Sequence, residues 1–465
     1  MTSYPSGRYV CTYEGTPPTY NSDGVKIEST YGRDVLEVTP TIEGIYISTT
    51  GPLKNLSVVQ EQYEELLKGG KYFHPRFLEK LSIMRGKVVR FMDWQGINNN
   101  PARQSWAKRA KVTDAFWGTE KGVPLEVIIN LCNRMEIHPW FNLHHTYSLS
   151  SVESFTRMVR DGLCPGLIPH FELSNECWNS AYYYQPQLQW MQKHGQSLWP
   201  DSTLPIWEKG WQYYGLRTTQ IGSIIKKIIP RSNMVLSSQA VNSYLARQSL
   251  ACPLWDQKVK VDCLAIAPYI SPLDPDNFHG TMDEFFASIP SFIDKAMEGV
   301  KAHKVLADEY GLELAAYEGG QGFVSTDQVM NDFYMQAQRD PRMTQITLDY
   351  LAKWKENGGG LFCYFSFCSA QNKWGAWGAL ESVMQETSPK YEALKQFGGV
   401  SLNGVSYWSS EMPFLDLVKN NGDWVPQGIK GSKWGTGQPV DRDENNWINS
   451  VPVGETVGLL LNRGM

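Results

Sequence analysis

The chain has 465 residues, which is enough for one large domain with a smaller one beside it. Its hydrophobic content of 42% and charged content of 20% are those of a globular protein and exclude a disordered one. The 43 basic and 48 acidic residues give a net charge of −5, so we expect neither nucleic acid nor an anionic membrane as a partner.

Neither targeting nor membrane insertion is indicated. The first eight residues contain no basic region followed by an apolar core, so we expect no secretory signal there. No stretch of about 18 apolar residues occurs that could span a membrane. The 8 cysteines include no C-x-x-C pair, which disfavours zinc ligation. Buried free thiols are the favoured interpretation, with disulfides as the alternative.

Residues 1–50 have the alternating pattern of β-strands, with strands expected at 8–13, 35–38 and 44–48. From about residue 51 the period changes, and between about 55 and 398 apolar runs alternate with helical patterns. Eight strands are expected in that part, at residues 56–59, 87–92, 137–144, 167–174, 234–236, 263–267, 313–318 and 361–366. They are mostly apolar on both faces, as parallel strands covered by helices must be.

Functional-looking side chains stand at the carboxyl ends of these strands. They are Arg90, Asn142, Glu176, Tyr269, Glu318 and Ser366. This placement is typical of a (β/α)8 TIM barrel, whose active site is built from the loops after the strands. A doubly wound open sheet is the competing fold, but it needs a glycine-rich phosphate turn after an early strand, and none is present.

The tail, residues 401–465, is rich in Gly, Asn and Trp and contains short strand-like runs at 414–418 and 456–461. Neither terminal segment is long enough for a sandwich alone. We therefore expect residues 1–50 and 401–465 to build one accessory β-sandwich packed on a barrel at 51–400. Asp441-x-Asp443-x-Asn445 has the start of a calcium loop but lacks its Gly and Glu, which favours a solvated turn.

Two carboxylates dominate the chemistry. Glu176 stands in Leu-Ser-Asn-Glu-x-Trp-Asn at the end of the fourth expected strand, and Glu318 stands in Tyr-Glu-Gly-Gly at the end of the seventh. In an eight-stranded barrel these ends face each other across the mouth. Hydrolysis of a glycoside with retention needs two carboxyls roughly 5 to 5.5 Å apart. Burial beside Trp178 and the charge of the partner carboxylate would raise the pKa of the acid.

These motifs resemble those of the clan A glycoside hydrolases, which are retaining (β/α)8-barrel enzymes, and the resemblance covers residues 55–398. It implies that Glu176 is the acid/base and Glu318 the nucleophile. It further implies that Asn175 bonds the sugar 2-hydroxyl, and that Arg90 and Tyr269 contact the nucleophile.

The clan often has a Trp directly after strand eight, where this chain has Ser366 and Phe367. Trp374 or Trp377 is therefore expected to form the floor of the −1 subsite. The 17 Trp and 23 Tyr suit a protein that stacks rings on sugars. Further candidate sugar-binding residues are Asp93, Trp94, Asn142, His144 and Trp178.

His144 and His145 are interpreted as a positioned loop pair, because no third metal ligand is spaced near them. We expect no metal and no cofactor. The sequence therefore predicts a retaining hydrolase of β-glycosidic bonds in a poly- or oligosaccharide, with endo action weakly favoured by the many loop aromatics. The alternatives are a non-catalytic carbohydrate-binding barrel and a transglycosylase using the same carboxylates. Secretion is expected of such an activity, although no signal is seen.

Overall fold

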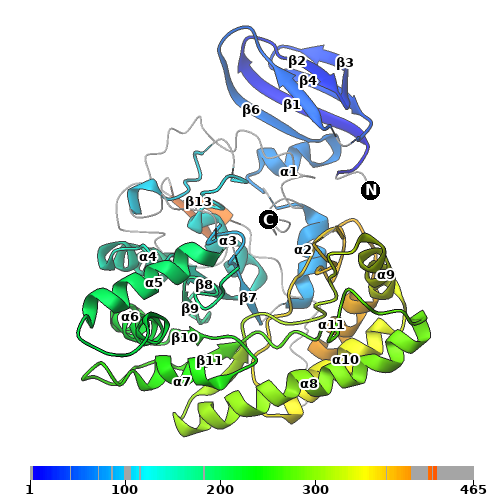
Figure 1. Cartoon of the computed structure of the whole chain (residues 1–465). Helices are drawn as coiled ribbons and strands as arrows, with labels where there is room; N and C mark the ends of the chain where they lie inside the picture. The colour runs from blue at the N-terminus through cyan, green and yellow to red at the C-terminus, as the bar shows by residue number, and fades with distance from the viewer. Residues whose placement is uncertain are drawn as a thin grey trace.

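The computed structural model describes residues 4–41, 43–71, 73–84, 87–98, 106–114, 117–181, 184–372 and 374–399, together with a hairpin at 417–420 and 423–426. Within these ranges the chain forms an N-terminal antiparallel sheet followed by a parallel sheet covered by helices (Figure 1). The N-terminal sheet lies at one end of the molecule, apart from the helices α4 to α11.

The N-terminal part contains two antiparallel sheets. A four-stranded sheet has the order β3-β4-β1-β6, and a second sheet pairs β2 with β5. Their bounds are β1 (Gly7–Gly15), β2 (Thr19–Ser22), β3 (Gly24–Thr30), β4 (Arg33–Val38), β5 (Ile45–Ser48) and β6 (Leu53–Gln60). The period of two puts Tyr9 and Cys11 in one apolar cluster and Val10 in another, so both faces of β1 are buried.

The strand expected at 56–59 is not a barrel strand, which corrects the sequence prediction. It belongs to β6, which pairs antiparallel with β1, with Val58 opposite Cys11 and Val59 opposite Val10. The N-terminal sheet therefore extends to Gln60 and does not end at residue 50. A strand with alternating apolar residues could belong to the N-terminal sheet or to the parallel sheet. Only the strand to which it is hydrogen-bonded shows which sheet it joins.

The shared sandwich of both termini stays a prediction. The tail contributes only the hairpin β13 (Leu417–Asn420) and β14 (Asp423–Pro426) to the described residues. The run at 456–461, the calcium-like pattern at 441–445 and residues 414–416 lie outside them.

The parallel sheet has six strands in the order β12-β11-β10-β9-β8-β7, so each strand lies beside its neighbour in the chain. The strands are β7 (Val88–Arg90), β8 (His138–Leu143), β9 (His170–Leu173), β10 (Asn233–Ser237), β11 (Cys263–Ile266) and β12 (Glu313–Ala316). The segment 360–365 extends the sheet beyond β12, because Cys363 N donates to Ala316 O at 2.9 Å and Phe365 N donates to Gly319 O at 2.8 Å. The strands expected from 87–92 to 313–318 are thereby confirmed, whereas the segment expected at 361–366 forms only a single bridge, between Phe362 and Ala316.

Helices cover the outer face of this sheet (Figure 1). They are α2 (Pro75–Leu81), α3 (Leu125–Met135), α4 (Leu149–Gly162), α5 (Gln185–Leu198), α6 (Ile206–Ile228), α7 (Ser243–Ala251), α8 (Met282–Glu309), α9 (Gln328–Arg339), α10 (Met343–Glu356) and α11 (Pro389–Gly399). Helix α1 (Glu64–Lys68) lies instead against the N-terminal sheet, where Leu67 packs on the cluster that contains Val10 and Val59 (Figure 1). Short 3-10 turns lie at Glu61–Tyr63, Ser82–Met84 and Trp106–Lys108. Capping residues mark the points where several of these helices begin. Ser148 caps α4, and Thr281 with Glu284 forms a capping box on α8.

The main core lies between sheet and helices and includes Phe141, Phe171 and Ile129, each fully buried. A second cluster, with Trp140, Val235 and Tyr317, fills the concave inner side of the sheet beneath the strand ends. Of the helices described, none is both long and apolar enough to cross a bilayer. All eight cysteines are free thiols, and six of them are buried.

Candidate active site

The turn that follows β9 positions the carboxyl group of Glu176. Along β9 the side chains of Phe171 and Leu173 enter the outer core, so Glu172 points to the inner side. The chain then turns sharply, because Ser174 and Glu176 both have left-handed backbones with φ of 58° and 44°. Such residues cost about 1 to 3 kcal/mol each and persist only where the surroundings hold them.

Neighbouring groups hold this turn in place. Ser174 N donates to Leu143 O at 2.6 Å, and Asn142 Nδ2 donates to Ser174 O at 2.7 Å. Gln187 on α5 donates to the carbonyl of Asn175 at 3.1 Å. The turn is thus tied both to the adjacent strand and to a covering helix, which explains how strained backbone is retained there.

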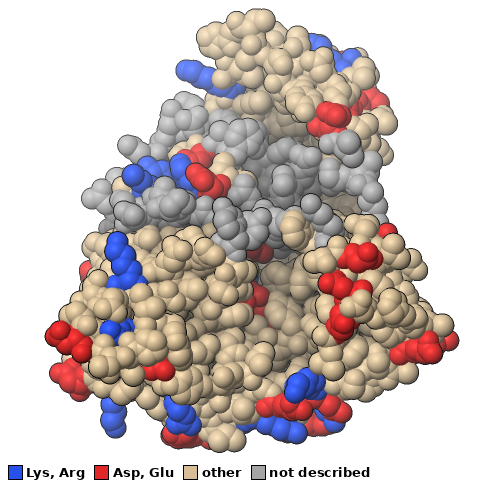
Figure 2. All heavy atoms as spheres, in the orientation of Figure 1, with Lys and Arg blue, Asp and Glu red and all other residues tan. Residues whose placement is uncertain are grey.

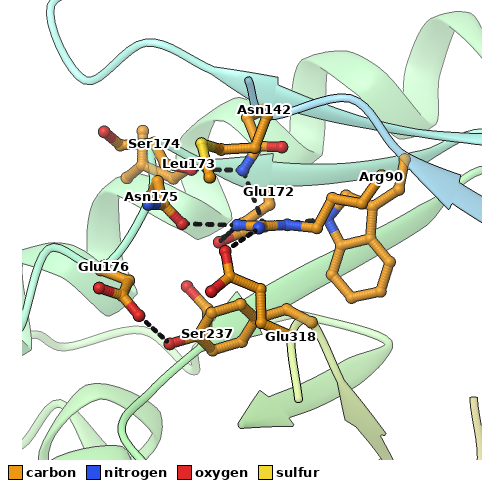
Figure 3. A network of polar contacts seen from close by, with 12 residues as sticks. Arg90, Asn142, Glu172, Leu173, Ser174, Asn175, Glu176, Ser237 and Glu318 are labelled. Atoms are coloured by element: carbon orange, nitrogen blue, oxygen red, sulfur yellow. Dashed lines mark hydrogen bonds and ion pairs between the residues drawn. The ribbon is translucent and has the colours of Figure 1, made fainter. Parts of the chain in front are cut away.

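Arg90, at the end of β7, lies at the centre of the polar network (Figure 3). Its Nε and Nη2 donate to the two oxygens of Glu172 at 2.8 and 3.0 Å. Its Nη1 donates to Glu318 at 2.7 Å, and Nη2 also donates to Asn175 Oδ1 at 2.7 Å. The guanidinium carbon lies 4.9 Å from the centre of the Tyr317 ring. One cation therefore joins the ends of β7, β9 and β12.

Glu318, which follows β12, is bonded as an ionised carboxylate. Besides Arg90, the hydroxyl of Tyr269 donates to its Oε2 at 2.9 Å. Burial raises the pKa of Glu318, while the charge of Arg90 and the bonds from Arg90 and Tyr269 act against that rise. These donors stabilise the charged form, as a nucleophilic carboxylate requires.

Glu176 has a different environment, although its residue exposure of 7% equals that of Glu318. Its oxygens accept bonds from Tyr317 Oη at 3.1 Å and Asn179 Nδ2 at 2.8 Å, and none of the described lysines or arginines forms an ion pair with it. Burial and then the charge of Glu318 raise its pKa from 4.5 to about 7. Glu318 is thus bonded to a cation and a hydroxyl, whereas the hydrogen-bond donors to Glu176 are neutral.

Asp93 is a third carboxyl near this pair. Burial and then the charge of Glu318 raise its pKa to about 7, with Arg90 acting in the opposite direction. That Asp93 contacts substrate stays a prediction. Figure 2 shows acidic side-chain atoms in a hollow at the centre of the visible face.

A cavity of about 680 Å³ lies beside Arg90, Asp93 and Glu318, between β7 and the segment 361–367. Its remaining walls are mainly apolar and include Phe77 and Leu394. It therefore belongs to the interior under the site and has few groups that could bind sugar hydroxyls.

The tryptophans expected at the site differ in how near they lie to its catalytic candidates. Trp178 Nε1 donates to Tyr317 Oη at 3.2 Å, so it lies beside the acid. The ring of Trp377 lies 5.4 Å from that of Tyr269, and its Nε1 donates to Trp374 O at 2.9 Å. Trp374 itself is 43% exposed. Trp377 is therefore the better candidate for the −1 floor.

Three expected substrate contacts are buried and packed or bonded within the protein, and their contact with substrate stays a prediction. Trp94 is only 5% exposed and packs against Phe77 and Phe91 in the main core. Asn142 is fully buried and binds the Glu172 carboxylate and the turn. His144 is 2% exposed and stacks on His145 with ring centres 4.2 Å apart. The packing of strands and loops against one another determines which way such residues face, and the sequence does not show that packing.

Sequence reasoning missed Glu172 and Tyr317 as parts of the site. A signal existed for Glu172, because a carboxylate within an apolar strand requires a buried partner. No signal distinguished Tyr317 from the other core tyrosines. In the histidine pair, burial lowers the pKa of His145 to about 4, and its Nδ1 lies 3.3 Å from Ser174 Oγ. Within the described ranges, no group of three or more His, Cys, Asp or Glu side chains is arranged to hold a metal ion.

Comparison with known proteins gives no family model and no curated protein that matches the chain. Solved structures similar to it include a 4-O-α-L-rhamnosyl-β-D-glucuronidase from Fusarium oxysporum, with 11% identity and a TM-score of 0.42 over 69% of this chain and 63% of that one. They also include an endo-1,4-β-D-mannanase from Thermotoga petrophila, with 12% identity and a TM-score of 0.40 over 70% and 96%. A xyloglucan-specific endo-β-1,4-glucanase of family 5 from a metagenomic library has 11% identity and a TM-score of 0.37 over 70% and 88%.

The raised pKa of Glu176 predicts a stability effect of Glu176→Gln. The folded state holds its proton up to about pH 7, whereas the unfolded chain releases it near 4.5. The parent therefore loses stability as pH rises through that window, and the neutral amide does not. We expect the variant to gain about 2 to 3 kcal/mol over the parent at pH 8 compared with pH 4.

Urea unfolding at both pH values measures this gain. The exposed Glu14→Gln serves as the control and should show no such pH-dependent gain. An equal difference between Glu176→Gln and the parent at pH 4 and pH 8 would contradict the assigned protonation.

Proposed function

We propose that the chain is a retaining glycoside hydrolase that cleaves β-glycosidic bonds in a poly- or oligosaccharide by double displacement. The contrast between the two carboxyls is the observation that supports this function. Glu318 is ion-paired and accepts a tyrosine hydroxyl, whereas Glu176 keeps a proton to about pH 7. A nucleophile and an acid at opposite sides of a barrel mouth are the two groups that the reaction needs.

In the first step, a carboxylate oxygen of Glu318 attacks the anomeric carbon while the bond to the leaving oxygen breaks. Glu176 donates its proton to that oxygen, and a glycosyl ester of Glu318 forms. Esterification removes the charge of Glu318 that helped to raise the pKa of Glu176. Glu176, ionised by its proton transfer to the leaving group, is therefore more stable as a carboxylate and accepts a proton from water, which attacks the anomeric carbon and releases Glu318 as a carboxylate.

Other residues orient the sugar in this proposal. Asn175 bonds the 2-hydroxyl, while Arg90 holds its amide oxygen. Asp93, whose pKa is raised by the charge of Glu318, contacts the same sugar ring in this proposal. Trp377 provides the floor of the −1 subsite and Trp178 the side of the leaving group.

The parallel strand order supports a (β/α)8 barrel for the catalytic part, although the strand at 56–59 is not part of it. Endo action is proposed from the loop aromatics alone. A non-catalytic carbohydrate-binding barrel is the alternative from another class. The matched pair of carboxyls disfavours it, since sugar binding alone does not require a buried acid with a raised pKa.

The function is tested by Glu318→Gln and Glu176→Gln on a panel of β-glucans, mannans, xylans and β-linked oligosaccharides. We expect Glu318→Gln to abolish hydrolysis and Glu176→Gln to reduce it by about 10² to 10⁴-fold. Proton NMR of the first product formed should show the β-anomer. Glu64→Gln, which alters a buried ion pair with Arg33 in the N-terminal part, is the matched control and should retain activity.

No hydrolysis by the parent on the whole panel, or retained hydrolysis in Glu318→Gln, would exclude this function. An α-anomer as first product would exclude double displacement. Transfer to an added sugar acceptor in place of water would identify the transglycosylase alternative.

Tyr317→Phe should shift the pH profile of kcat/KM. The hydroxyl of Tyr317 stabilises ionised Glu176, so its removal raises the pKa of the acid. The protonated acid then persists to higher pH, and we expect the alkaline limb to move up by about 0.5 to 1 unit.

Tyr334→Phe provides the control, because Tyr334 is equally buried but its hydroxyl donates to Pro275 O in another part of the fold. Its alkaline limb should match that of the parent. A downward shift in Tyr317→Phe would show that Glu176 is not the acid.

A further inference from the structure

Glu172 is a further carboxylate of the site, and the double displacement does not use it. It lies on β9 with no exposed surface, four positions before Glu176. A carboxylate in such a place is stable only when cations and hydrogen-bond donors satisfy it.

Donors from two neighbouring strands surround Glu172. Its Oε2 accepts bonds from Arg90 Nε at 2.8 Å, Trp140 Nε1 at 2.9 Å and Asn142 Nδ2 at 2.8 Å. Its Oε1 accepts a bond from Arg90 Nη2 at 3.0 Å. Each of these groups therefore donates a hydrogen bond to the Glu172 carboxylate.

The paired bonds from Arg90 fix the plane of its guanidinium. A carboxylate that binds the Nε and Nη2 edge sets both the position and the rotation of the planar group. The remaining nitrogen, Nη1, then points at Glu318, and the second bond of Nη2 reaches Asn175 (Figure 3). Glu172 touches neither the expected nucleophile nor the sugar-binding amide, yet both are held through the cation that it orients.

A second connection runs to the acid. Asn142 donates to Glu172 and, through the same amide nitrogen, to the carbonyl of Ser174 in the strained turn before Glu176. A simple ion pair for stability would need no such connections to both catalytic segments.

Resting on the function proposed above, we propose that Glu172 is a positioning residue, which orients Arg90 toward the nucleophile Glu318 and toward Asn175. It acts through Arg90 and not on the substrate.

Glu172→Gln tests this role with almost no change of shape. The amide keeps one acceptor oxygen but presents an NH2 group where the carboxylate had an acceptor. Because all surrounding groups are donors, either orientation of the amide sets donor against donor at Arg90 or at Trp140 and Asn142. The guanidinium is displaced, and its contact with Glu318 weakens.

The pKa of Glu318 distinguishes a positioning role of Glu172 from a purely electrostatic effect of its negative charge. Glu172 as a negative charge raises the pKa of Glu318, so removal of the charge alone lowers that pKa. Loss of the Arg90 contact raises it. The titratable and charged groups that interact with Glu318 from the neighbouring elements are Arg90, Asp93, Glu172, Glu176, Tyr184, Tyr269, Tyr317 and Cys363.

We expect carbon-13 NMR of labelled glutamates, with Glu318 assigned by its own substitution, to show a higher pKa of Glu318 in Glu172→Gln. The acid limb of the kcat profile should move up with it. We also expect kcat to fall roughly 100-fold, the scale for a misplaced catalytic group, with a smaller change in KM.

Two further variants keep the test decisive if Glu172→Gln is poorly folded. Trp140→Phe removes one donor to Glu172 without changing charge and should shift the pKa of Glu318 in the same direction by less. Glu64→Gln breaks the comparable bidentate pair with Arg33, far from the site, and should leave the pKa and kcat unchanged.

A lower or unchanged pKa of Glu318 in Glu172→Gln, or a full kcat, would overturn the positioning role. The NMR titration needs no substrate, so the two proposals can fail separately. If the parent is inactive on all glycans but the pKa of Glu318 rises in Glu172→Gln as expected, the proposed function is refuted and the positioning role is supported. An active parent whose Glu172→Gln variant keeps its kcat would refute only the positioning.

Discussion

The burial of the Arg90 charge is the constraint on which the site depends. A guanidinium does not give up its proton, so in the interior it must be matched by carboxylates in good geometry. Glu172 and Glu318 supply them, from β9 and β12. The ends of three strands are thereby joined at one point, and Asn175 is bound to the same group. Any shift of one strand would leave a buried charge unpaired, which makes the arrangement rigid.

This cation also divides the carboxyls into two kinds. Glu318 shares Arg90 and accepts the hydroxyl of Tyr269, whereas Glu176, placed by the left-handed turn after β9, has only neutral donors. The charge of the first then helps to keep the second protonated. The arrangement lowers stability, because a buried acid with a raised pKa and a strained turn are both unfavourable in the folded state. Such costs are typical of sites selected for chemistry over stability.

Much of this site could be predicted from the sequence, because a parallel sheet brings the carboxyl ends of its strands together along one edge. Arg90, Glu176, Tyr269 and Glu318 end separate strands, and parallel strands meet at their carboxyl ends. The strand at 56–59 was misassigned because its pattern fits two sheets, and only its pairing with β1 distinguishes them. The direction in which Trp94 faces, and the bonding of Glu172 to Arg90 on another strand, depend on packing between segments distant in the chain.

The most direct test of the central claim is to trap the nucleophile. A glycosyl fluoride carrying fluorine at C2 forms its ester normally, but the ester hydrolyses slowly, so mass spectrometry of peptides can locate it. We expect a single adduct on the peptide that contains Glu318, absent from Glu318→Gln. An adduct on Glu172, Glu176 or Asp93 would contradict it, as would hydrolysis of the reagent by the parent without any adduct.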